Sequence, residues 1–280
     1  MVADEIPPAA RSGVSKGAFA GTVIVVAIIA LVAGMGLDRV LYPAPTGGGP
    51  LPTLVIGTNT PFPPFEYRDD NDNIVGFDID LVKEVMKRMD RSVEVVNYRD
   101  FGALLTAVGG GTIDIAASSI TIRADRNATM DFTDPYFESD QAVLVRAGFT
   151  GLTCAGDVCV AADLAGFSVA TQAGTTSEYW VSDNVPGASA NLTTFPDVTQ
   201  VLQALQTSAV DLVVIDKPAG DGIVAASPTV FRLEGTVETN ELYGFAVANN
   251  DPSHLVAGMN KALRDIRADG TYATIVARWF

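Results

Sequence analysis

The sequence predicts an α/β fold with a largely parallel sheet, divided into two similar halves. Short apolar runs rich in β-branched residues alternate with segments whose apolar residues recur at helical spacing. This alternation is typical of strands connected by helices. The pattern restarts near residue 139, and the C-terminal segment is expected to return to the first half. This indicates two lobes joined by more than one crossing of the chain.

In the first half, a buried strand at 53–58 precedes a proline-bounded aromatic loop. The helix expected at 77–89 has Asp78 as its N-cap, and the helix at 100–111 is capped by Asp100 and stopped by glycines. Two further strands are expected at 93–98 and 113–118.

The second half repeats the alternation of strands and helices, and its C-terminal segment is expected to rejoin the first half. Strands are expected at 141–147, 167–172, 210–216, 229–233 and 243–249. Helices are expected at 174–180, 197–206, 217–225 and 252–270, followed by a last helix that ends at Trp279 and Phe280. In α/β architectures, ligands bind at the carboxyl ends of the strands.

Composition excludes some classes of function. The net charge is −15, with 18% charged and 48% hydrophobic residues, which indicates a folded protein that does not bind nucleic acid through a basic surface. No triad, nucleophile elbow or zinc-protease motif is visible, and no cofactor or metal is expected. The acidic run at 69–73 lacks the glycine of a calcium loop and is interpreted as a polar turn.

Residues 18–37 form an uncharged apolar run that is long enough to span a bilayer. Arg11 and Lys16 precede it, so residues 1–17 are expected to be cytoplasmic and the remainder extracytoplasmic. We favour an uncleaved signal anchor over a cleaved signal peptide, because the run is longer than a usual signal core. Residues 38–52 are a tether rich in proline and glycine.

The chain has two cysteines, Cys154 and Cys159. Outside the cytoplasm such a pair favours a small disulfide loop. A zinc site is the weaker alternative, because two thiols leave two ligand positions empty and the single histidine is distant in sequence.

A hydroxyl cluster precedes an arginine in the segment at 113–136. Ser118, Ser119 and Thr121 come before Arg126, and a guanidinium with nearby hydroxyls suits a small carboxylate. Taken alone, Arg126 is better explained as a surface ion-pair residue, and it is the wider pattern that favours a ligand site.

Six segments in order resemble one family. They are IGTNTPFPPFEY, VGFDIDLVKEVMKRM, DFGALLTAVGGGTIDIAASSITIRADRNATMDFTDPYFES, VATQAGTTSEYW, VDLVVIDKP and YGFAVANNDPSHLVAGMNKALRDIRADGTYATIVARWF. Over residues 53–280 the chain is similar to the extracytoplasmic solute-binding proteins of polar amino acid ABC transporters. The resemblance implies a Venus-flytrap fold of the periplasmic-binding-protein type with two hinge strands. Lobe 1 would comprise 53–138 and 243–280, and lobe 2 would comprise 139–242.

The resemblance also implies roles for single residues. Arg126, with Ser119 and Thr121 and the neighbouring Ser118, would bind the ligand carboxylate. Asp216 would bind the α-ammonium group. The other implied contacts are Thr175 and Thr176 on the carboxylate, Phe62 and Phe101 flanking the ligand, and Asn59 and Gln172 facing its side chain.

These assignments agree with the chemistry of a zwitterion, which needs one fixed cation and one fixed anion. With these on opposite lobes, a ligand bridges the lobes and favours the closed state. For Phe62 and Phe101 the alternative is core packing, and for Asp216 it is a helix N-cap. Asn59 stands where many family members have an acidic residue, which favours a neutral polar or acidic ligand, although Glu66 complicates this expectation.

Three functions are consistent with the sequence. The first is an amino acid receptor that delivers its ligand to an ABC permease. The second is an enzyme resembling cyclohexadienyl and arogenate dehydratases, with Glu66 or Glu178 as the general acid. The third is a ligand-sensing module that acts through a partner.

Overall fold

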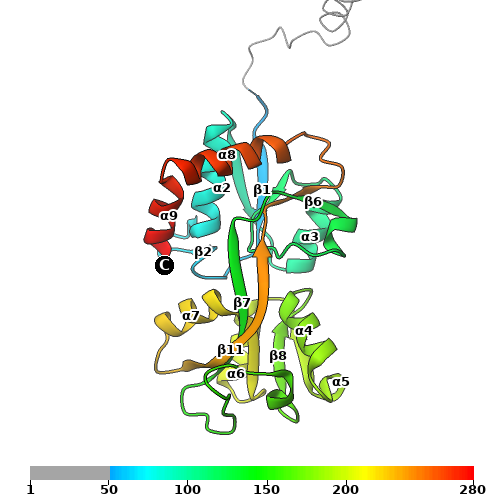
Figure 1. The fold of residues 1–280 in the computed structure, drawn as a ribbon, viewed down its shortest axis with the longest axis vertical. Helices are drawn as coiled ribbons and strands as arrows, with labels where there is room; N and C mark the ends of the chain where they lie inside the picture. Colours follow the sequence, from blue (N-terminus) through cyan, green and yellow to red (C-terminus); the bar gives the residue numbers. More distant parts are fainter. Residues whose placement is uncertain (1–50) are drawn as a thin grey trace, which may run out of the picture. The chain divides into compact units, whose positions relative to one another are not determined.

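Two five-stranded sheets organise residues 51–280, the part of the chain that the computed structural model describes (Figure 1). Each sheet has helices packed on it and forms the centre of one lobe. The lobes are connected by two long strands, β7 (Phe137–Arg146) and β11 (Phe231–Tyr243), which pair antiparallel.

The first sheet has the strand order β4-β1-β5-β12-β6. Strands β4, β1 and β5 are parallel, whereas β12 runs antiparallel to both of its neighbours. The strands are β1 (Leu54–Thr58), β4 (Val93–Asn97), β5 (Ile115–Ala116), β6 (Met130–Phe132) and β12 (Ala246–Ala248). A separate two-stranded ribbon joins β2 (Tyr67–Arg68) to β3 (Ile74–Val75).

Helices from both ends of the described chain complete the first lobe. They are α2 (Phe77–Arg88), α3 (Phe101–Gly109), α8 (Val256–Ala268) and α9 (Thr271–Trp279). Helix α2 packs against α8 and α9, although almost 170 residues separate them in sequence. The core between them is aromatic, with fully buried Phe65, Phe77 and Phe245.

The second sheet has the order β11-β7-β10-β8-β9. Its members besides β7 and β11 are β8 (Val169–Gln172), β9 (Leu192–Phe195) and β10 (Leu212–Asp216), which run parallel to one another. The helices of this lobe are α4 (Thr176–Asn184), α5 (Ala188–Asn191), α6 (Val198–Gln206) and α7 (Lys217–Ala226). Short 3-10 turns lie at Arg126–Ala128 (η1) and Ala161–Leu164 (η2).

The structure corrects several sequence-based expectations. Each sheet is largely parallel, as expected, but contains one strand that runs against its neighbours, β12 in the first sheet and β7 in the second. The run at 229–233 belongs to one strand that continues to Tyr243. Helix α8 begins at Val256, four residues later than expected.

Asp78 is not an N-cap. Helix α2 begins at Phe77 with Gly76 as its N-cap, so Asp78 lies inside the first turn. Its fully buried carboxylate accepts hydrogen bonds from the backbone N–H of Ser119 (2.7 Å) and the hydroxyl of Tyr136 (2.6 Å). The Asp100 cap is present, because its carboxylate accepts from the N–H of Ala103.

Cys154 and Cys159 form a disulfide bond. Both sulfur atoms are part of the apolar core of the second lobe. The Cys159 N–H donates to the carbonyl of Thr236, which joins this loop to β11.

The anchor expected at 18–37 lies outside the described residues, as do residues 1–17 and most of the tether. Within residues 51–280, no helix combines the length and apolar character that crossing a membrane requires.

Candidate ligand-binding site

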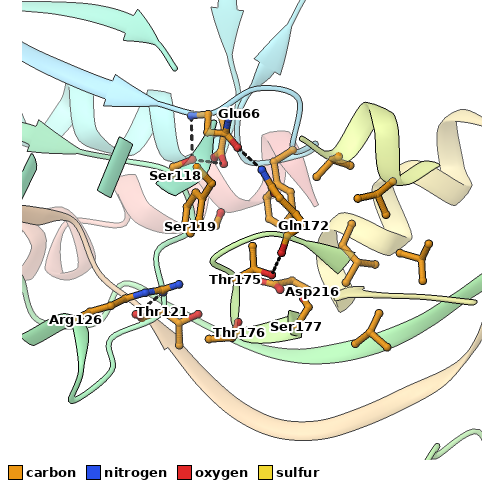
Figure 2. A pocket seen from close by; sticks show the side chains of 18 residues that line it. Glu66, Ser118, Ser119, Thr121, Arg126, Gln172, Thr175, Thr176, Ser177 and Asp216 are labelled. Atoms are coloured by element: carbon orange, nitrogen blue, oxygen red, sulfur yellow. Dashed lines mark hydrogen bonds between the residues drawn. The ribbon is translucent and has the colours of Figure 1, made fainter. Parts of the chain in front are cut away.

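A cavity between the lobes brings together all eleven residues that the sequence predicts for the ligand site (Figure 2). They come from segments up to 157 positions apart, from Asn59 to Asp216. The cavity also includes residues that the sequence analysis did not count among the ligand contacts, namely Glu66, Ser177, Val198, Val201, Val213, Val214 and Ile215.

Arg126 supplies the positive charge of the cavity. It lies on η1, its side chain is only 6% exposed, and its guanidinium carbon is 5.5 Å from the centre of the Phe101 ring. Nη1 donates to the carbonyl of Thr121 (2.9 Å), and Nη2 donates across the lobes to the carbonyl of Gly174 (3.0 Å). Burial lowers the pKa of the Arg126 guanidinium below its usual value.

No carboxylate among residues 51–280 forms an ion pair with Arg126. Burying a cation is costly unless an anion compensates it. The three N–H groups of Arg126 that bind no atom of residues 51–280 can form a bidentate pair with a carboxylate. Arg126 is therefore a buried cation suited to an anionic ligand group.

Ser119 has a backbone conformation that few non-glycine residues adopt, with φ of 48°. Its N–H donates to Asp78, which holds the turn in place. Its hydroxyl lines the cavity, is buried, and has no hydrogen-bond partner among the described residues. A buried unpaired hydroxyl costs free energy, so Ser119 is a second group with free capacity for a ligand.

The other two hydroxyls of the cluster are already bonded. Ser118 donates to Glu66 (2.9 Å) and accepts from the N–H of Asn59 (3.1 Å). Thr121 donates to Glu241 (2.7 Å), so its proton points away from the cavity in this arrangement. Sequence reasoning grouped the three hydroxyls, whereas the structure leaves only that of Ser119 free.

Asp216 supplies a negative charge from the second lobe, at the end of β10. It occupies the N-cap position of α7 but makes no capping hydrogen bond. Instead, its carboxylate accepts from the amide of Gln141 (2.6 Å) and from the hydroxyl of Tyr243. Burial and the neighbouring Glu241 raise the pKa of Asp216 to about 7, so a cation beside it would stabilise its ionised form.

Asn59 and Gln172 line the cavity and are hydrogen-bonded to each other. The Gln172 Nε2 donates to the Asn59 Oδ1 (2.8 Å) and also to the carbonyl of Pro196 (3.1 Å). The Asn59 amide nitrogen donates to the carbonyl of Tyr98 (2.7 Å). The pair therefore connects the end of β1 to the end of β8 across the two lobes.

The sequence analysis recognised Glu66 as an acid that complicates the ligand preference, but did not count it among the ligand contacts, although it lines the cavity. It is 1% exposed, and one of its oxygens accepts from Ser118 while the other has no partner among the described residues. Burial, reinforced by Asp78, raises the pKa of Glu66 well above its usual value. The available signal was its position four residues after Phe62 in the aromatic loop, which proline restrains.

Glu178, the other acidic residue considered for catalysis, does not line the cavity. Its carboxylate accepts from the N–H of Gly174 (2.6 Å). It thereby stabilises the turn that begins α4.

Aromatic and hydroxyl groups enclose the cavity. Phe62 packs against buried clusters of both lobes, and Phe101 belongs to the core under α3 while also lining the cavity. Thr175 caps α4, and Thr176 is its first residue. The N-terminus of this helix therefore opens on the cavity, where its free N–H groups favour an anion.

Together these features define a two-lobed binding protein whose cavity holds a buried cation on one lobe and a buried acid on the other. The sequence profile of the bacterial extracellular solute-binding proteins, family 3, matches residues 54–280. The chain belongs to this family.

Three relatives illustrate the similarity. A probable histidine-binding protein of Neisseria gonorrhoeae is 32% identical over 228 residues, which cover 80% of this chain and 82% of that protein. The structure of an ancestral arginine-binding protein bound to arginine is 35% identical with a TM-score of 0.76, covering 83% of this chain and all of that one. A structure of an ancestral arginine-binding protein bound to glutamine is 35% identical with a TM-score of 0.74, covering 81% and 97%.

These findings confirm the family predicted from the ordered motifs, and with it the two-lobed fold. They also decide against the dehydratase alternative. The relatives are binding proteins, and the chain is a solute-binding protein rather than an enzyme.

Proposed function

We propose that this protein binds one L-α-amino acid between its lobes, outside the cytoplasm, and delivers it to an ABC permease. The observation that carries the proposal is Arg126, a buried guanidinium in the cavity with no carboxylate partner among residues 51–280. A ligand carboxylate on Arg126 and an ammonium group on Asp216 would satisfy both charges at once. Because the two residues lie on different lobes, the ligand would hold the lobes together.

The side chain of the ligand would extend toward Glu66. This acid has one oxygen without a partner among the described residues, so it suits a side chain that donates hydrogen bonds. A cationic side chain would also favour its ionised form. We therefore propose a basic amino acid, such as arginine or histidine, as the preferred ligand.

This proposal replaces the neutral polar or acidic preference expected from Asn59 and Gln172. Both amide nitrogens and the Asn59 Oδ1 make hydrogen bonds within the protein, so the neutrality of these side chains carries less weight than the acid Glu66.

A thermal-shift screen of the purified domain, residues 48–280, against the twenty amino acids tests the function. A basic amino acid should raise the melting temperature most, because a ligand that binds only the folded state stabilises it. If no amino acid raises the melting temperature, the proposal is wrong.

Arg126→Ala tests the assignment of the carboxylate. The substitution should weaken amino acid binding by roughly 2–5 kcal/mol, the cost of removing one partner of a buried charged pair. Isothermal titration calorimetry measures the loss, and the exposed Arg99→Ala is the matched control. Unchanged affinity in Arg126→Ala would rule out this site.

Two further proposals rest on the sequence. Residues 18–37 would be retained as a signal anchor, which the mass of the mature protein in membranes would decide. The lobe boundaries, 53–138 with 243–280 and 139–242, would mark the units that move in closure.

A further inference from the structure

The two strands that connect the lobes carry a pair of buried polar side chains. Gln141 on β7 is fully buried, and Glu241 on β11 is 8% exposed. The Gln141 Nε2 donates to the Glu241 Oε1 at 2.9 Å. Neither residue lines the cavity, so neither belongs to the candidate ligand contacts.

A bulge in β11 brings the two side chains together. Val237 pairs with Gln141, and the next pair in the register is Glu241 with Ser139. Three residues therefore intervene on β11 where one intervenes on β7. Asp140 stabilises this excursion by accepting from the N–H groups at 239 and 240, both at 2.9 Å. Bulges commonly redirect a side chain in this way.

Glu241 is connected to the cationic end of the site. Its Oε2 accepts from the hydroxyl of Thr121 at 2.7 Å. The carbonyl of Thr121 in turn accepts from Nη1 of Arg126 at 2.9 Å. Glu241 therefore orients the residue whose backbone holds the buried guanidinium.

Gln141 is connected to the acidic end of the site. The same Nε2 that donates to Glu241 also donates to the Asp216 Oδ1 at 2.6 Å. Its Oε1 accepts from the hydroxyl of Ser177 at 2.7 Å, which fixes the orientation of the amide. A continuous chain of hydrogen bonds thus runs from Arg126 through Thr121, Glu241 and Gln141 to Asp216.

We propose that Gln141 and Glu241 are positioning residues that join the cationic and acidic ends of the amino acid site through the connecting strands. The proposal rests on the proposed function, because it takes Arg126 and Asp216 as the ligand's partners. Through this chain of hydrogen bonds, β7 and β11 position both Arg126 and Asp216. A change in the pairing of β7 with β11 during closure would therefore move both residues at once. The charge of Glu241 also favours a ligand ammonium beside Asp216.

The charged and titratable groups around Asp216 come from several elements. Glu241 and Tyr243 lie on β11, Glu66 lies in the loop after β1, and Arg126 lies on η1. Glu241 raises the pKa of Asp216, whereas Arg126 lowers it. Removing the charge of Glu241 should therefore lower the pKa of Asp216 and shift the pH dependence of binding.

The test is Glu241→Gln, assayed by calorimetry with L-arginine and with L-glutamine from pH 5 to pH 9. The variant should bind both at least about tenfold more weakly at pH 8, because a charged hydrogen bond is lost. In the variant, the pH below which protonation of Asp216 weakens binding should also be lower than in the wild type. The matched control is Glu238→Gln, an exposed glutamate on the same bulge, which should match the wild type in both respects.

Thr121→Val provides a second variant that removes only the lobe 1 end of the connection. Its effect on affinity should be smaller in the Glu241→Gln background than in the wild type, because both substitutions remove the same hydrogen bond. Fully additive effects, or a Glu241→Gln variant with wild-type affinity and pH profile, would overturn the proposal while the wild type still binds. A wild-type protein that binds no amino acid would contradict the proposed function itself.

Discussion

Arg126 illustrates how burial changes the meaning of a residue. In the sequence it is one of 18 basic residues and is consistent with a surface ion pair. In the structure it is nearly inaccessible and points into a cavity with Ser119, whose hydroxyl has no partner among the described residues. In a protein core, buried polar groups are hydrogen-bonded to one another. A cluster of buried polar groups that still have unused donors or acceptors indicates a binding site instead.

The substitution of this single residue, Glu66→Gln, should change the ligand preference of the site. Removal of the carboxylate is expected to weaken L-arginine binding by about 1.5–3 kcal/mol, the usual contribution of a hydrogen bond to a charged group. Binding of L-glutamine should change less, because its side chain carries no charge. Calorimetry on both ligands measures the difference.

Glu94→Gln, an exposed change of the same kind on β4, is the control. Equal losses for the two ligands would show that Glu66 does not contact the side chain.

At the scale of elements, strand ends determine what the site contains. Asn59 follows β1 and Gln172 ends β8, so the amides meet only when the lobes are close. Their mutual hydrogen bond makes them part of the contact between the lobes. Both line the cavity, as the sequence predicts, but their amide nitrogens donate hydrogen bonds within the protein.

Gln172→Ala should therefore weaken every amino acid ligand by a similar amount. The loss expected is about 0.5–1.5 kcal/mol, the net contribution of a neutral hydrogen bond, because only the closed arrangement contains it. The ratio of L-arginine to L-glutamine affinity, measured by calorimetry, should stay as in the wild type. The control is Gln203→Ala on α6, where the side chain is exposed. A changed ratio would mean that Gln172 contacts the ligand after all.

At the scale of the whole molecule, the protein has an acidic net charge and also buries several carboxyl groups. The chain carries a net charge of −15, and buried Glu66, Asp78, Asp216 and Glu241 add carboxyl groups to the interior. Burial raises the pKa of Asp78 to about 7, and burial and Glu241 do the same for Asp216. The protonation of the interior should therefore change near neutral pH.

This arrangement predicts a pH dependence of stability. Asp78 has a pKa of about 7 in the folded protein, above its usual 3.8, so the folded state binds more protons between these values. Its favourable contribution is complete below about pH 4 and is lost as the pH rises through about 7.

Calorimetric melting of Asp78→Asn from pH 4 to pH 8 checks this expectation. Relative to the wild type, the variant should gain several degrees as the pH rises, since about 1 kcal/mol shifts the melting temperature by about 2–4 °C in a domain of this size. The exposed Asp70→Asn should stay parallel to the wild type. If the melting temperature of Asp78→Asn also follows that of the wild type at every pH, the raised pKa of Asp78 is not the cause of the pH dependence.

The ordered motifs predicted much of the fold and the membership of the site. Local patterns place β1, α3 with its Asp100 cap, and β10 close to their observed bounds, because apolar periodicity and capping depend on neighbours in sequence. The position of Asp78 was misjudged because a buried hydrogen bond to Ser119, 41 residues away, competes with helix capping.

The sequence by itself determined the family, the two-lobed α/β architecture and eleven of the residues that line the cavity. Only the tertiary structure decided which of their polar groups are free. Asn59 accepts a hydrogen bond from Gln172, Thr121 is bonded to Glu241, and Glu66 retains an oxygen without a partner among the described residues. The physical reason is that hydrogen bonding depends on distances between groups from different segments, which local sequence patterns do not encode.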